Sequence, residues 1–78
     1  MTQKTRIRLR NDRSSSLEVR LEPWGEIYEF AVGETIEVTA SGPDSEMLEV
    51  EVGDSSITIH GWVGSSVSLL RDGRECVP

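Results

Sequence analysis

The 78-residue chain has few of the residues that cross-link or coordinate small domains. It contains one cysteine, Cys76, and one histidine, His60. A disulfide within one chain is therefore excluded, and a zinc site built from several cysteines and histidines is excluded as well. A blue-copper site would take His60, Cys76 and Met47 or Met1, but it lacks the second imidazole that such sites use. Folding must depend on patterned apolar residues, because a domain this small buries only about 60% of its unfolded surface.

The sequence also has little that would direct it to a membrane or to nucleic acid. No apolar run approaches the ~20 residues of a transmembrane helix, and the first ten residues lack the apolar core of a signal peptide. The net charge of -6 and the pI near 4.6 oppose general polyanion binding, which depends on basic patches. With one cysteine and no secretory signal, we expect a cytoplasmic protein with no membrane and no nucleic-acid partner.

What the sequence does have is a hydrophobic period of two. Ile7 and Leu9 alternate with arginines, and Tyr28 and Phe30 share one face of a segment whose Ile27 faces the other way. The same alternation, typical of half-buried strands, recurs in residues 17–22, 36–40, 48–52, 57–60 and 67–70. No stretch shows the spacing of an amphipathic helix.

Turn-forming clusters rich in Gly, Pro, Ser and Asn separate these segments. Short alternating strands at such spacings predict an all-β fold, a small antiparallel β-sandwich with Greek-key or barrel-like connections. We expect about seven strands in one domain over residues 1–78. Asp72-Gly73 is a type I′ hairpin signal, so the tail should fold back as a short last strand through Cys76.

Charge is segregated along the chain. Residues 1–20 carry six bases and two acids, a local charge of +4, whereas residues 21–60 carry ten acids and no base. The arginine row of the first strand could bind polyanions, or it could pair across strands with an acidic row, which stabilises sheets. The second interpretation also accounts for the acids, so we expect the row Arg6, Arg8 and Arg10 to lie beside Glu37 or beside Glu49 and Glu51.

Two tryptophans lie in turn contexts rather than at regular strand positions. Trp24 and Trp62 could form a platform that binds a sugar ring or a protein partner, since tryptophan is enriched in interface hot spots. Alternatively, they could plug one end of the sandwich, with neighbouring glycines allowing close approach. The candidate contact surface predicted from the sequence consists of Trp24, Gly25, Tyr28, Gly61 and Trp62.

No catalytic constellation is visible. A Cys76–His60 dyad is formally possible, but His60 alternates with Ile57 and Ile59 as a surface residue would, and Cys76 suits a peripheral packing position. The phosphate-loop, nucleophile-elbow and metal-ligand motifs are absent. We therefore expect no enzyme activity, no catalytic residue, no metal and no cofactor.

The segment Glu22-Pro23-Trp24-Gly25, followed by an aromatic strand and Gly33-Glu34, resembles short bacterial proteins of no assigned activity; the residues Gly61 to Ser65 and Asp72-Gly73 fit the same pattern. This resemblance implies a compact bacterial β-domain and assigns no functional residue. We expect a non-catalytic binding or protein-interaction module whose partner is an unknown protein. The alternative is a small-ligand or carbohydrate-binding module using the same aromatics. The arginine-bearing first strand suits a sheet edge, and homo-oligomerisation through the last strand stays open.

Overall fold

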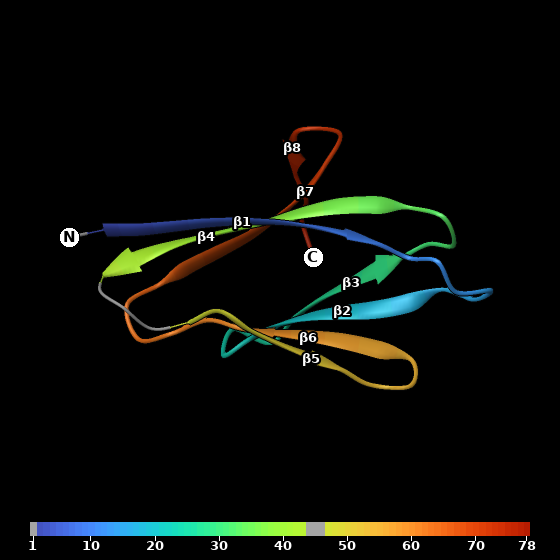
Figure 1. Cartoon of the computed structure of the whole chain (residues 1–78), viewed down its shortest axis with the longest axis horizontal. Coiled ribbons are helices and arrows are strands. Elements are labelled where there is room, and N and C mark those ends of the chain that lie inside the picture. The colour runs from blue at the N-terminus through green and yellow to red at the C-terminus, as the bar shows by residue number, and fades with distance from the viewer. Residues whose placement is uncertain (1, 44–46) are drawn as a thin grey trace.

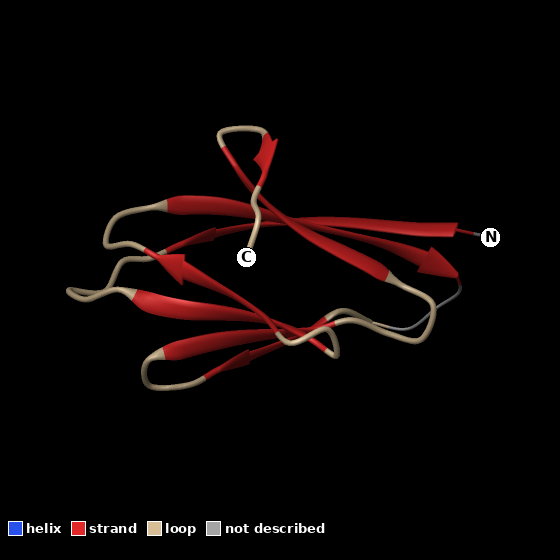
Figure 2. Ribbon diagram, turned by 180° about the vertical axis from the view of Figure 1, so that it is seen from behind, coloured by secondary structure: helices blue, strands red, loops and turns tan. Residues whose placement is uncertain are grey.

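The computed structural model describes residues 2–43 and 47–78, and this part of the chain forms eight strands in two packed sheets (Figures 1 and 2). The expected all-β class is confirmed. Met1, one of the methionines considered for copper, lies outside the described residues. The strands are β1 (Thr2–Arg10), β2 (Leu17–Glu22), β3 (Glu26–Phe30), β4 (Thr35–Pro43), β5 (Glu49–Val52), β6 (Ser56–His60), β7 (Ser66–Arg71) and β8 (Arg74–Glu75).

The first sheet has the order β1-β4-β7-β8 and is antiparallel throughout. The second has the order β3-β2-β6-β5 and contains one parallel pair, β2 with β6. The expected antiparallel sandwich is interrupted by that one parallel pair, and the described residues form eight strands where about seven were expected. An alternating pattern reports only which face is buried, and it is the same for parallel and antiparallel neighbours.

The core lies between the inward faces of the two sheets. Each long strand contributes every second residue, as the alternation predicts, and Ile27 faces away from the buried Tyr28 and Phe30. The buried cluster consists of Leu17, Val19, Leu21, Tyr28, Phe30, Ile36, Val38, Ile59 and Leu69. Because both sheets contribute to this one cluster, they form a single packing unit.

A buried asparagine ties the turn after β1 to the end of β3. The two N–H groups of the Asn11 side chain are shared among the carbonyl oxygens of Phe30 (3.0 Å), Ser15 (3.0 Å) and Ala31 (3.2 Å), and its Oδ1 accepts a hydrogen bond from Arg13 N (2.9 Å). A fully buried amide is stable only when its polar atoms are satisfied in this way. Asn11 thus joins the two sheets at one end of the sandwich.

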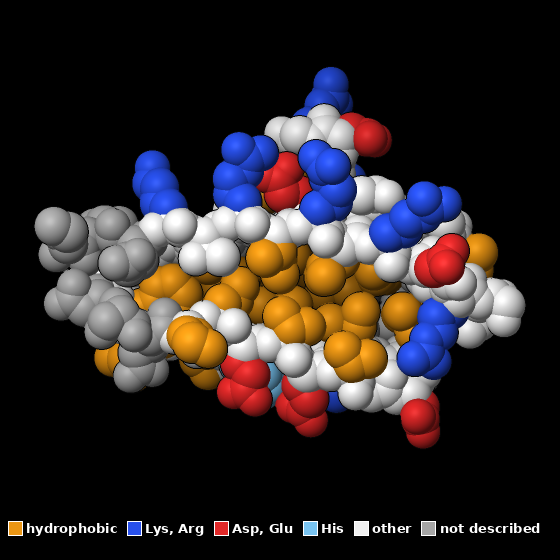
Figure 3. Space-filling view, in the orientation of Figure 1, with side chains coloured by type: hydrophobic (Ala, Val, Ile, Leu, Met, Phe, Trp, Pro, Cys, Tyr) orange, Lys and Arg blue, Asp and Glu red, His pale blue; other side chains and the backbone are white. Residues whose placement is uncertain are grey.

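One side of the sandwich is open. In the view of Figure 3, hydrophobic side chains are visible between the two sheets, with a row of Lys and Arg side chains along the upper margin and Asp and Glu side chains along the lower one. The strands that border this side are β1 and β5, each at the edge of its sheet.

The opposite side is closed by the segment that follows the C-terminal hairpin, which turns from β8 toward the second sheet (Figure 2). Asp72 and Gly73 both have positive φ, 52° and 78°, which confirms the predicted type I′ turn. The last strand is shorter than expected, but Cys76 N still donates to Leu69 O (2.8 Å) and extends the pairing by one residue. The half-buried Cys76 side chain packs against the core.

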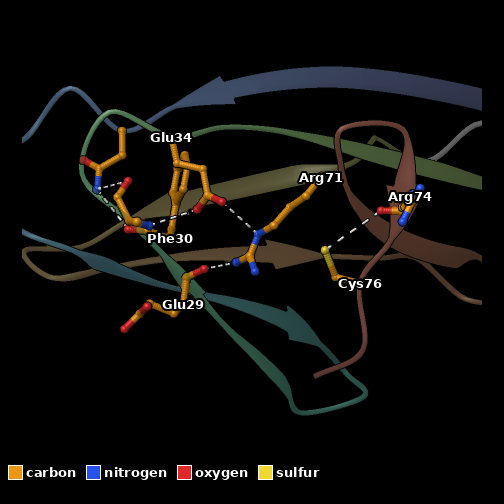
Figure 4. Close-up of polar contacts among 8 residues, drawn as sticks. Glu29, Phe30, Glu34, Arg71, Arg74 and Cys76 are labelled. Carbon is orange, nitrogen blue, oxygen red and sulfur yellow. Dashed lines mark hydrogen bonds and ion pairs between the residues drawn. The ribbon is translucent and has the colours of Figure 1, made fainter.

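Arg71 fastens this closed side to the second sheet (Figure 4). Its guanidinium donates a hydrogen bond to the carbonyl oxygen of Glu29 on β3. Its Nε lies 3.1 Å from Glu34 Oε2, an ion-pair contact without hydrogen-bond geometry. The β7–β8 edge and the β3 edge are therefore bridged by a charged side chain.

Candidate functional site

The turn after β2 and the loop after β6 form an open hollow of about 480 Å³ at one end of the sandwich. Its lining is Glu22, Pro23, Trp24, His60, Gly61, Trp62, Val63, Gly64 and Ser65. Three of the five residues singled out in the sequence, Trp24, Gly61 and Trp62, thus lie together.

The parallel pairing of β2 and β6 brings these two loops side by side. Glu22 and His60 are opposite each other in the ladder, and Gly61 N donates a hydrogen bond to Glu22 O (2.9 Å) just beyond it. Because parallel strands end at the same edge of a sheet, the chain segments that follow them are neighbours. The hollow is therefore a direct consequence of the parallel pairing of β2 with β6.

Trp24 is the exposed aromatic of the hollow. Its side chain is 42% exposed, and its ring lies directly against Gly61: a Cβ at residue 61 would stand 2.6 Å from Trp24 Cη2 and 2.7 Å from Ser65 Oγ. Real Cβ atoms do not come so close to other heavy atoms, so Gly61 permits an indole position that any side chain would block.

Trp62 is the buried aromatic of the hollow. Only 7% of it is exposed, and its Nε1 donates to Pro43 O at the end of β4 (2.6 Å). Ser65 Oγ accepts a hydrogen bond from Trp62 N (2.8 Å) and donates one to Trp62 O (2.6 Å). Each of the two interpretations therefore holds for one tryptophan. Trp62 plugs the end of the sandwich, whereas Trp24 presents an indole to solvent.

The remaining two predicted contact residues lie elsewhere. Gly25 is outside the hollow lining, and its positive φ of 74° allows the turn between β2 and β3. Tyr28 is buried in the core, opposite Val19 in the ladder, and its hydroxyl donates to Glu26 Oε1 (3.0 Å). Burial, followed by the contact with Glu26, raises the pKa of Tyr28 to about 12. A phenol held in this way is not free to contact a ligand in the hollow.

The arginine row lies beside an acidic residue of its own sheet, as expected. Arg8 and Glu37 are opposite each other on β1 and β4, and Arg6 Nε lies 2.7 Å from Glu37 Oε2. The Arg6 hydrogen bond lowers the pKa of Glu37. Glu49 and Glu51, the other acidic row considered, lie on β5 in the second sheet. The expected neighbour is therefore Glu37 alone.

The candidate metal and nucleophile residues are far apart in the fold. His60 is on the outer face of β6, where its Nε2 lies 3.0 Å from Glu51 Oε1. Cys76 follows β8 at the edge of the other sheet. Among residues 2–43 and 47–78, three His, Cys, Asp or Glu side chains nowhere gather at metal-binding distance. The Cys76–His60 dyad considered from the sequence therefore has no geometric basis.

Asn11 is the structural residue that the sequence patterns did not single out. It stands at the start of a turn cluster, where asparagine is common, and nothing local marks it as buried.

The described strands and turns contain no helix long and apolar enough to cross a lipid bilayer. Comparisons of the chain with known protein families, with curated proteins and with solved structures find no match.

Proposed function

We propose that the protein is a non-catalytic binding module that contacts a protein partner through the hollow formed by the turn after β2 and the loop after β6. The observation that carries the proposal is the half-exposed indole of Trp24, held over Gly61 while Trp62 is fixed beneath the same loops. A large aromatic that is already ordered before binding loses little conformational entropy in the complex. Such residues dominate the binding energy of many interfaces.

The surroundings of Trp24 favour a protein side chain as its contact. The hollow is open, and its apolar lining is supplied by Pro23, Trp24 and Val63. Of the polar side chains in the lining, Ser65 uses its hydroxyl within the loop and His60 contacts Glu51, which leaves the carboxylate of Glu22. Small-molecule sites usually combine an apolar wall with several convergent free polar groups. A partner that inserts an apolar side chain against the indole needs fewer of them.

A photo-crosslinking experiment tests the protein-partner proposal. Benzoylphenylalanine replaces Val63, which lines the hollow and is 91% exposed, or Val77, which is equally exposed at 89% but lies in the C-terminal tail. Irradiation in cells that make the chain should produce a specific adduct from the variant at position 63 and not from the variant at position 77. The adduct should weaken when Trp24→Ala is added. Equal adducts from both positions, or an adduct indifferent to Trp24→Ala, contradict the proposal.

The second candidate is a carbohydrate-binding module, favoured by the same exposed indole, on which a sugar ring could stack. NMR separates it from the first: the Nε1–H signals of Trp24 and Trp62 are followed during titration with an oligosaccharide panel. Sugar binding should move the Trp24 signal and leave Trp62, whose Nε1 is already bonded to Pro43 O, nearly unchanged. A panel that leaves the Trp24 signal in place, together with an empty glycan array, eliminates this candidate.

Gly61→Ala provides a structural control for both candidates. The added Cβ would collide with Trp24 and with Ser65 Oγ, so the indole should move while the buried core stays as it is. Binding that depends on the position of Trp24 should then fall as it does in Trp24→Ala.

We further propose a cytoplasmic location, which the single free cysteine supports.

A further inference from the structure

The open side of the sandwich exposes residues that the fold turns toward the core. Val50 and Val52 are opposite Ile59 and Ile57 in the ladder, so they share the inward face of the second sheet. They are nevertheless 38% and 68% exposed. On the closed side, by contrast, Arg71 bridges the gap between the sheets and Cys76 packs against the core. Apolar side chains that border an uncovered core are typical of a surface that another molecule covers.

The two strands that border this side are free edges. Among the described residues, β1 pairs only with β4, and β5 pairs only with β6. Each strand therefore keeps one row of backbone N–H and C=O groups without a ladder partner. The two rows cannot pair within one molecule, because they belong to different sheets, and packed sheets lie about 10 Å apart. Free edges of this kind are templates for strand addition.

The outward faces of the two edges carry opposite charges. On β1 every exposed even-numbered position is basic, and of these only Arg6 has an ion-pair partner within residues 2–43 and 47–78. On β5 the outward positions are Glu49 and Glu51, opposite His60 and Thr58. Figure 3 shows the result as a basic margin above the apolar band and an acidic margin below it. The basic row consists of Lys4, Arg6, Arg8 and Arg10.

We propose that a second copy of this chain covers the open side, with β1 of each copy alongside β5 of the other. Strands β1 and β5 run in the same direction across the open side (Figure 1). A two-fold axis parallel to the strands therefore places β1 of one copy next to β5 of the other at both junctions. Each sheet of one copy is then extended by the opposite sheet of the other, and the inward valines of both copies are buried in between.

Charge selects this arrangement over the other possible two-fold. An axis perpendicular to the strands would set β1 against β1, so that the arginine rows would repel each other, and β5 against β5 with the same result for the glutamates. In the proposed arrangement each basic row neighbours an acidic one on the same outer surface. An unrelated partner would need an acidic strand for one edge and a basic strand for the other, whereas this chain carries both.

Complementary charge-reversal variants test the arrangement. The first variant, Glu49→Lys with Glu51→Lys, makes both edges basic. The second, Lys4→Glu with Arg10→Glu, makes the β1 edge more acidic at positions opposite Ser41 and Thr35, and it leaves Arg6 and Arg8 beside Glu37. Sedimentation velocity at low salt, from about 10 μM to about 1 mM, measures association. The wild type should dimerise increasingly with concentration, and added salt should weaken the dimer.

Each variant alone should associate at least about tenfold more weakly, because a single cross-strand charge pair changes an equilibrium about 1.4- to 5-fold and every reversal acts at two junctions. An equimolar mixture should recover a dimer of one copy of each, since each variant then supplies the charge that the other lacks. The matched control is Glu29→Lys with Glu75→Lys, which makes the same charge change at exposed residues of β3 and β8 on the closed side and should associate like the wild type.

Three outcomes overturn the proposal. The first is a wild type that stays monomeric up to about 1 mM, the second is association that neither variant weakens, and the third is a mixture that stays monomeric. Amide NMR spectra of dilute samples establish that each variant is folded before its association is interpreted. The salt dependence of wild-type association tests the role of charge without any substitution that could affect folding. None of these substitutions replaces a residue that lines the Trp24 hollow, and the wild-type measurements leave it untouched, so failure here leaves the proposed binding function standing.

Discussion

Replacing Asn11 by alanine should remove a large fraction of the stability of this domain. The two N–H groups of the Asn11 side chain are shared among three carbonyl oxygens, and its Oδ1 accepts a hydrogen bond from Arg13 N. A typical hydrogen bond contributes a net ~1 kcal/mol, and a buried group left without a partner costs more. Phe30 O is buried, so water cannot replace the bond that it loses in the variant, whereas Ser15 and Ala31 are exposed residues whose carbonyls can regain water.

The sum is a loss of about 3 kcal/mol in the free energy of unfolding. Globular proteins have roughly 0.05–0.15 kcal/mol of stability per residue, so a chain of this length has about 4–12 kcal/mol in total. For a domain of this size the loss corresponds to a Tm lower by about 12–24 °C. Urea denaturation followed by circular dichroism measures the free energy, and Asp12→Ala, at an exposed neighbour, should stay within about 0.5 kcal/mol of the wild type.

Asn11→Asp sharpens the test because it keeps the acceptor and removes the donor. At neutral pH the carboxylate would face three carbonyl oxygens, so the variant should be less stable than Asn11→Ala. Burial and these oxygens should raise the pKa of the folded-state carboxyl above its unfolded value of about 3.9. Its deficit should then be smallest below about pH 4 and grow as the pH rises from there to the raised folded-state pKa. A loss under about 1 kcal/mol for Asn11→Ala, or an aspartate tolerated at neutral pH, would refute the role assigned to this residue.

Three further results are expected from the same geometry. Absorbance titration of Tyr28 should give a pKa of about 12. Because the unfolded phenol ionises near 10, the free energy of unfolding should fall as the pH rises from about 10 toward 12. A folded-state pKa near 10 would contradict the burial of Tyr28. Arg6→Gln should return the lowered pKa of Glu37 to its ordinary range in an NMR titration. In the wild type, the stability that the Arg6–Glu37 pair adds should be lost as the pH falls through the lowered pKa of Glu37. A Glu37 pKa that Arg6→Gln leaves unchanged would exclude the contact. Iodide should quench Trp24 and spare Trp62, so Trp24→Phe should remove the quenchable emission, and equal quenching of both indoles would argue against one plugging the sandwich.

Much of the fold can be read from local patterns. The alternation of apolar and polar residues identifies the strands and the inward face of each, including the placement of Ile27 opposite Tyr28 and Phe30. The Asp72-Gly73 turn is equally local, because its backbone requires positive φ at both residues. The charge segregation predicted that the arginine row has an acidic neighbour, and Glu37 fills that place.

The site is less readable from sequence. Trp24 and Gly61 are 37 positions apart, since 61 − 24 = 37, and only the parallel ladder between β2 and β6 brings them together. The same alternation fits either strand direction, so the sequence could not distinguish the exposed tryptophan from the buried one. From the sequence, Tyr28 is expected to lie with them because it is an aromatic close to Trp24 in the chain. Its side chain points into the core instead, as alternation along β3 requires.

The sequence by itself therefore determined the class of fold, the faces of its strands and the position of its last hairpin, because these follow from periodicity and turn chemistry within a few residues. Tertiary structure decided which strands are neighbours, which side of the sandwich is closed by Arg71 and which is left open, and where Asn11 and Trp62 are buried. Those features depend on contacts between residues far apart in the chain. Many pairings satisfy one alternating pattern, and the packing of the whole core selects among them.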